Sequence, residues 1–80
     1  LMKAAKLGLP EAQHNLGDNH VQEGNTRKAM AWFIEAAQNN FLPSMVNVGM
    51  MFLRGTAEVS PNPVAAMIWF RLANRIEGSE

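Results

Sequence analysis

Apolar side chains recur along this chain at helical spacing, in segments separated by glycine, asparagine and proline. The clearest stripe follows the i, i+3, i+4, i+7, i+8 pattern of one buried helix face and consists of Ala29, Trp32, Phe33, Ala36 and Ala37. Helices commonly end at Gly or Asn and accept Pro in their first turn, so these residues mark the boundaries. The pattern predicts the tail of a helix in residues 1–7, no strand, and four full helices over residues 10–22, 27–38, 42–54 and 63–76.

Asparagine residues stand at both kinds of helix boundary. Asn40 takes the place that Gly8 has one unit earlier, and we expect it to end its helix in the left-handed conformation. Asn25 and Asn62 precede helices and are predicted to cap them. Residues 56–61 are the one real loop that the sequence predicts, an insertion relative to the short turn before Asn25.

The chain repeats its own pattern. The stripe around Trp32 returns around Trp69, and the pair Leu16-Gly17 returns as Val48-Gly49. Self-similarity about every 30 to 40 residues is typical of helical solenoids, in which each unit buries its apolar face against its neighbours. We therefore predict an all-α, right-handed α-α superhelix (solenoid) of antiparallel helical hairpins, with about five helices. We expect one domain that is part of a longer array, divided into the end of a preceding repeat and two repeats at residues 1–8, 9–40 and 41–78.

Two glycines fall inside predicted helices, where Gly costs about 1 kcal/mol relative to Ala. They are Gly17 and Gly49. A helix tolerates this cost where a side chain would block the close approach of a neighbouring helix. Trp32 and Trp69 are predicted to fill the wider gaps between hairpins. We interpret the aromatic stripe as core rather than as a cofactor site, and expect no cofactor.

Composition narrows the classes of function. The 80 residues are 48% hydrophobic and include 7 basic and 7 acidic residues, which leaves a formal net charge of zero. Such a chain lacks the basic surface that nucleic-acid-binding proteins use to neutralise phosphates. No apolar run approaches the roughly 18 residues of a membrane span, and the absence of cysteine excludes disulfides and thiolate metal sites. We expect neither a nucleic acid nor a small-molecule substrate.

The repeated positions together resemble the Sel-1-like repeat, a relative of the tetratricopeptide repeat. The family pattern is A-x-x-x-L-G-x-x-[aromatic]-x-x-G, a turn, and then A-x-x-W-[aromatic]-x-x-A-A-x-x-G. In the first repeat of this chain the matching residues are Ala12, Leu16, Gly17, Ala29, Trp32, Phe33, Ala36 and Ala37. In the second repeat they are Ser44, Val48, Gly49, Phe52, Gly55, Ala66, Trp69, Phe70 and Ala73.

The chain departs from that pattern at four positions. His20 stands where the family usually has Tyr, and Gly24 falls one place late because the first turn is short. Asn40 replaces a Gly and Asn74 replaces the second Ala of its pair. The resemblance implies a non-catalytic scaffold or adaptor that assembles protein complexes through a curved helical surface.

In related solenoids the first helix of each hairpin lines the concave face, so the resemblance implies that a partner protein binds there. Val46, Met50 and Leu53 have helical spacing and would form an apolar strip able to accept a partner helix or an extended peptide. The alternative is that this strip packs against the neighbouring repeat. The complete predicted binding set is His14, Asp18, Gln22, Val46, Met50, Leu53 and Arg54.

Three other functions compete with adaptor binding. His14 and Asp18 share a helix face and suggest metal or acid–base chemistry, but we expect His14 to lie solvated in the groove and His20 to fill an aromatic core position. An RNA-reading helical repeat conflicts with the zero net charge. A structural subunit packed inside a large multiprotein assembly is the main alternative, because the last helix is apolar on almost all sides.

Overall fold

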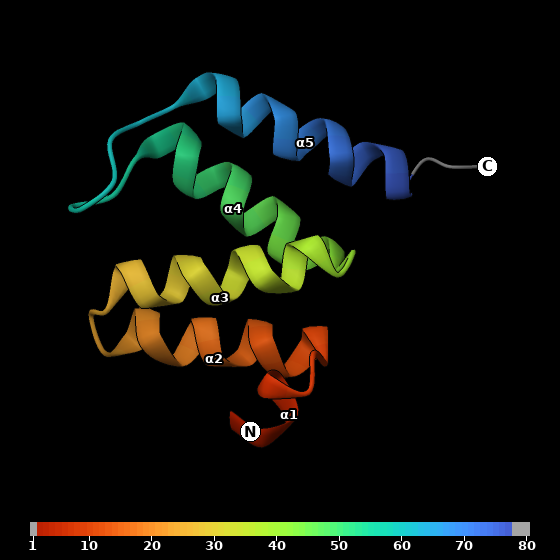
Figure 1. Cartoon of the computed structure of the whole chain (residues 1–80). Coiled ribbons are helices and arrows are strands. Elements are labelled where there is room, and N and C mark those ends of the chain that lie inside the picture. Colours follow the sequence, from red (N-terminus) through yellow and green to blue (C-terminus); the bar gives the residue numbers. More distant parts are fainter. Residues whose placement is uncertain (1, 78–80) are drawn as a thin grey trace.

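A computed structural model describes residues 2–77, which form helices and turns without a strand (Figure 1). The helices are α1 (Met2–Lys6), α2 (Pro10–Gln22), α3 (Thr26–Gln38), α4 (Leu42–Arg54) and α5 (Pro63–Glu77). The four full helices agree with the predicted ranges to within one residue at each end. The prediction of an all-helical fold is therefore confirmed.

Each helix packs against the next one along the chain. Contacts join α1 to α2, α2 to α3, α3 to α4 and α4 to α5. Figure 1 shows α3 lying between α2 and α4, with α1 and α5 at opposite ends of the stack. The Cα atoms fill a slab of 32 × 32 × 14 Å. This arrangement, with contacts mainly between successive elements, is that of a helical repeat.

The helix boundaries depend on residues with positive φ and on backbone hydrogen bonds. Gly8 has φ 86° and Asn40 has φ 66°, so the predicted left-handed Asn is confirmed. Asn62 Oδ1 accepts a hydrogen bond of 3.1 Å from the Ala65 N–H, which confirms its capping role. Asn25 also occupies the N-cap position of α3, but its side chain makes no capping hydrogen bond, because its amide donates to Glu23 Oε1 at 3.5 Å instead.

The connection between α4 and α5 is an ordered loop. Gly55 begins it with φ 73°, and a Cβ at this position would lie 2.7 Å from the Pro61 side chain. The loop is closed by a 2.6 Å hydrogen bond from the Asn62 N–H to the Phe52 carbonyl. Arg27, at the start of α3, lies 3.5 Å from the Glu58 carboxylate. The loop extends beyond the helices at one side of the stack (Figure 1).

The two glycines inside helices permit a close contact within each hairpin. A Cβ placed on Gly17 in α2 would lie 2.5 Å from the Phe33 ring of α3. A Cβ placed on Gly49 in α4 would lie 2.6 Å from the Phe70 ring of α5. The predicted reason for glycine at these positions is therefore confirmed, and the neighbour in both cases is an aromatic ring rather than a backbone.

The tryptophans join successive units of the stack. Trp32 of α3 packs against the apolar cluster of Ala5, Ala12 and Leu16, which α1 and α2 contribute. Trp69 of α5 packs against two clusters at once, one around Ala29, Phe33 and Val48 and the other around Ala37, Met45 and Ala73. Both rings are partly buried. Their predicted place between units is confirmed.

Candidate protein-interaction surface

His14 is covered by residues of both hairpins. Its ring centroid lies 5.0 Å from that of Phe33 and 5.4 Å from that of Phe41. Its Nδ1 lies 2.6 Å from Ser44 Oγ, a hydrogen bond between α2 and α4. The His14 side chain is only 15% exposed. The expectation that His14 lies solvated in the groove is therefore wrong, because the second hairpin covers the ring.

Asp18, His14 and Ser44 together form a connected polar array. Asp18 Oδ2 lies 3.6 Å from His14 Nε2, as expected for residues four apart on one helix face. The order carboxylate, imidazole and hydroxyl is that of a nucleophilic triad, yet Ser44 is 0% exposed and cannot reach a substrate. The array instead connects the two hairpins.

His20 lies apart from this array. Its Nδ1 is 3.4 Å from Glu23 Oε1 on the same helix, and the nitrogen is buried without a hydrogen bond of good geometry. Within the part of the chain that the structure describes, no three His, Asp or Glu side chains gather as a metal site would require. In the same range, no helix is long and apolar enough to cross a bilayer.

A groove of about 390 Å³ opens between α2 and α4. We call it the inter-hairpin groove and define it by its lining, which comes from both hairpins and from the loop after α4: Asp18, Val21, Thr26, Phe33, Asn47, Met50, Met51 and Thr56. Four of these eight side chains are apolar and four are polar. The polar atoms belong to one carboxylate, one amide and two hydroxyls, all of which can fix the orientation of a bound segment.

The structure divides the predicted binding set among different surroundings. Asp18 and Met50 line the inter-hairpin groove. Leu53 lines a second hollow against α5. Three further residues, Gln22, Val46 and Arg54, are exposed and line neither hollow.

The apolar strip on α4 is exposed rather than packed within the described chain. Val46 is 41% exposed and Leu53 is 47% exposed. Packing against the first repeat, within the residues that the structure describes, therefore leaves these two side chains exposed. Met50, between them in the strip, is half-buried at the edge of the inter-hairpin groove.

The sequence analysis missed several residues that shape this surface. Asn47 and Met51 line the groove but lie about one helical position, or 100°, from the face that was predicted to point inward. Gln13 is 2% exposed and holds the first hairpin together, since its amide donates to the Ala5 carbonyl at 3.1 Å and accepts from Asn39 Nδ2 at 3.2 Å. No sequence signal indicated this role, because Met45 stands at the corresponding position of the second repeat and Gln13 is not repeated.

Comparison with known protein families agrees with this arrangement. The Sel1 repeat model matches the chain twice, at residues 10–41 and 42–75. The first match contains the α2–α3 hairpin, and the second contains α4 and most of α5. No curated protein and no solved structure matches the chain significantly. Since the two family matches cover most of its length, the chain belongs to the Sel1 repeat family.

Proposed function

We propose that this chain is a non-catalytic adaptor that binds a helix or an extended peptide of a partner protein in the inter-hairpin groove. Sel1 repeats are generally protein–protein interaction modules and are typically without catalytic activity. The observation that carries the proposal is the groove itself, whose lining side chains come from both repeats. Such a site depends on the stacking of two hairpins and would be absent from one repeat alone.

The lining suits a partner segment with one apolar anchor and a nearby hydrogen-bond donor. Met50 and Met51 offer flexible, polarizable side chains that adapt to differently shaped apolar groups. Val21, on the facing helix, is 50% exposed and would lose that exposed surface on binding. The Asp18 side chain is also 50% exposed, so its carboxylate can accept a hydrogen bond or an ion pair from the partner.

A photo-cross-linking amino acid tests this proposal. Placed at Asn47, inside the groove, it should capture the partner, whereas the same group at exposed Glu35 on α3 should not. Met50→Glu should weaken binding at least about tenfold, because it introduces a charge among apolar contacts. Gln22→Glu is the matched control, since it adds the same charge outside the groove. Equal capture from both positions, or unchanged binding by Met50→Glu, would contradict the proposal.

A further inference from the structure

The Asp18 carboxylate lies between the inter-hairpin groove and the His14 ring. It is the one charged side chain among the eight that line the groove. Its Oδ2 lies 3.6 Å from His14 Nε2, which is longer than a hydrogen bond between these atoms. Since the Asp18 side chain is also 50% exposed, its oxygens can accept a hydrogen bond from a donor that arrives through the groove.

No basic side chain of the described chain neutralises this carboxylate. The lining of the groove contains neither Lys nor Arg. Arg27, in the first turn of α3, pairs with Glu58 instead. Among the residues that the structure describes, His14 is thus the only ion-pair partner of Asp18. A negative charge in an otherwise neutral groove favours a bound segment that carries a positive charge.

Ser44 determines which nitrogen of the neutral His14 ring carries the proton. Ser44 is 0% exposed, and the one hydrogen bond of its side chain in the described structure joins Oγ to His14 Nδ1 at 2.6 Å. When the hydroxyl donates to Nδ1, the ring proton lies on Nε2, the nitrogen that faces Asp18. The other tautomer would place the Nε2 lone pair against the carboxylate, which is repulsive. The neutral ring therefore has its proton on Nε2.

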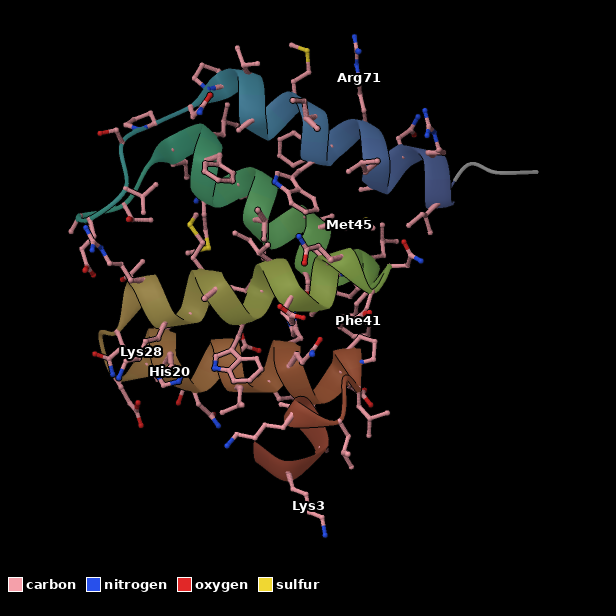
Figure 2. All side chains as sticks on the ribbon, viewed as in Figure 1. Lys3, His20, Lys28, Phe41, Met45 and Arg71 are labelled. Atoms are coloured by element: carbon pink, nitrogen blue, oxygen red, sulfur yellow. The ribbon has the colours of Figure 1, made fainter. Side chains whose placement is uncertain are left out.

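The other neighbours of the His14 ring carry no charge. They are Phe33 of α3, Phe41 directly before α4 and Ser44 of α4. His20, the second histidine of α2, lies toward the opposite side of the stack from Phe41 (Figure 2). The charge of the His14 ring therefore acts directly on the one carboxylate beside it.

A second proton on this ring would change what Asp18 offers to the groove. Histidine is the side chain whose charge ordinarily changes between about pH 8 and about pH 5. A charged His14 would pair with Asp18, as oppositely charged residues four apart on a helix do. The proton on His14 and a cation in the groove would then compete for the same carboxylate.

We propose that the segment bound in the inter-hairpin groove presents a Lys or Arg side chain to Asp18, and that protonation of His14 weakens its binding. This inference rests on the proposed function and adds the chemistry of the partner and its control by pH. The alkyl stem of the cation lies against Met50 and Met51, and its charged head reaches the carboxylate. Because two positive charges beside one carboxylate repel, the proton and the cation disfavour each other to the same degree. The affinity for the cationic segment therefore rises with pH.

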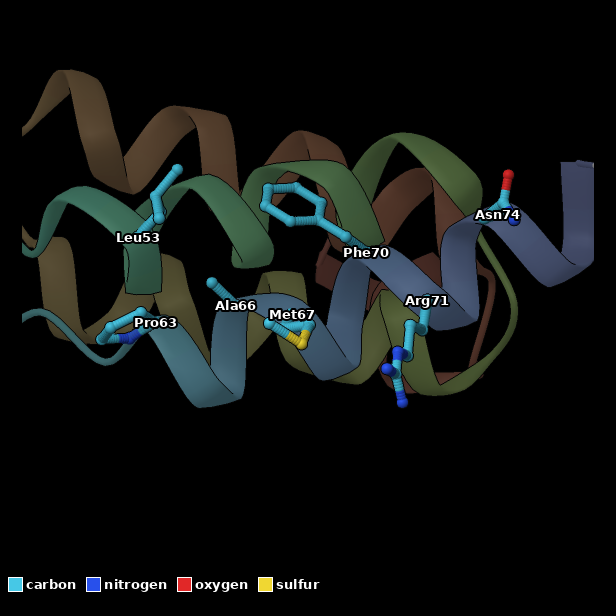
Figure 3. A pocket seen from close by; sticks show the side chains of 7 residues that line it. All are labelled: Leu53, Pro63, Ala66, Met67, Phe70, Arg71 and Asn74. Atoms are coloured by element: carbon cyan, nitrogen blue, oxygen red, sulfur yellow. The ribbon is translucent and has the colours of Figure 1, made fainter.

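The probes are n-hexylguanidinium and 1-hexanol, which have the same alkyl chain with and without a positive charge. The guanidinium keeps its charge throughout the range of the experiment. Each probe is titrated at about pH 8 and about pH 5.5 into the 80-residue chain with labelled methionine methyl groups. NMR follows Met50 and Met51 in the groove, while Met67 reports on the separate hollow between α4 and α5 (Figure 3).

At about pH 8 the guanidinium should bind at least about threefold more tightly than the alcohol, and this preference should fall by at least about threefold at about pH 5.5. Asp18→Asn should remove both the preference and its pH dependence. Glu11→Gln is the matched control, since it removes the same charge from an exposed position of α2 outside the groove. It should leave both unchanged.

Two histidine variants test the role of the ring. His14→Gln should keep the preference for the cation and remove its dependence on pH. His20→Gln changes the other histidine of the same helix and should leave the pH dependence as it is. Circular dichroism at both pH values checks that the helices remain, because His14 also joins the two hairpins. Asp18→Asn, at a half-exposed position, tests the pairing even where His14→Gln impairs folding.

Several results would overturn this inference. Equal affinities of the two probes at Met50 and Met51 would do so, while leaving the apolar part of the groove available to the proposed partner. A cation preference that does not change with pH, or a pH dependence that survives His14→Gln, would contradict the competition for Asp18. Absence of saturable binding by both probes would also contradict the inference, whereas cross-linking from Asn47 judges the proposed function independently.

Discussion

At the scale of single residues, the packing of each hairpin depends on a missing side chain. Gly17 and Gly49 each face an aromatic ring of the following helix, Phe33 in the first repeat and Phe70 in the second. The same pair of residue types, a glycine and a phenylalanine, therefore makes the close helix contact in both repeats. The cost of a glycine inside a helix is offset by the close contact that it permits.

Gly17→Ala should lower the free energy of unfolding by about 1–2 kcal/mol. The added methyl raises helix propensity by about 1 kcal/mol, but overpacking in a core typically costs about 1–3 kcal/mol. Overpacking should prevail because the new Cβ would lie 2.5 Å from a Phe33 ring that is only 2% exposed. Urea denaturation followed by circular dichroism measures the change.

The control for this prediction removes the aromatic ring that the new methyl would meet. In a Phe33→Leu background, Gly17→Ala should cost less than in the natural chain, because the clashing ring atoms are gone. Equal costs in both backgrounds would show that the ring contact is not the cause. Ala31→Gly, at an exposed position of α3, gives the helix-propensity term alone.

At the scale of helices and turns, two asparagines at equivalent boundaries have different roles. Asn62 Oδ1 accepts a hydrogen bond from the Ala65 N–H at the start of α5. Asn25 makes no such bond, and only its backbone carbonyl contributes, by accepting the Ala29 N–H at 2.9 Å. The connection before α5 is longer than the turn before α3. We infer that it lets the Asn62 side chain reach the first turn of its helix, whereas the short turn does not let the Asn25 side chain do so.

Asn62→Ala should therefore destabilise the chain by about 1 kcal/mol, the usual cost of removing an N-cap side chain. Asn25→Ala is the matched variant, and it should change stability by at most about 0.5 kcal/mol, as expected of a surface substitution. Chemical denaturation of both variants measures the difference. Similar losses in the two would indicate that the side-chain cap of α5 contributes nothing specific.

The helices were predictable from the sequence because their boundaries carry strong local signals. Pro10, Gly8 and the left-handed Asn40 fix where helices start and stop, and these signals act within a few residues. The direction of each α4 side chain depends instead on how far the helix is rotated against α3. That rotation depends on long-range contacts such as His14 with Ser44. Met50 was therefore predicted to line the surface, whereas its groove neighbours Asn47 and Met51 lie one position from the predicted face.

At the scale of the whole molecule, cooperativity depends on the contacts between the two hairpins. In a linear stack each repeat is stabilised by its nearest neighbour, so weakening one interface should uncouple the units on its two sides. His14 lies at that interface. Its ring contacts Phe33 of the first hairpin, Phe41 directly before α4, and Ser44 within α4.

The tryptophans allow the two hairpins to be followed separately. With Trp69→Phe the remaining fluorescence reports on the first repeat, and with Trp32→Phe it reports on the second. In these single-tryptophan chains the urea midpoints should coincide if the stack unfolds as one unit.

Adding His14→Ala should move the midpoints apart, because it leaves buried Ser44 without its partner at a typical cost of about 1–3 kcal/mol. Gln22→Ala, an exposed change on the same helix, should keep them together. Midpoints that already differ before His14→Ala, or that stay coincident after it, would mean that the coupling of the repeats does not depend on this histidine.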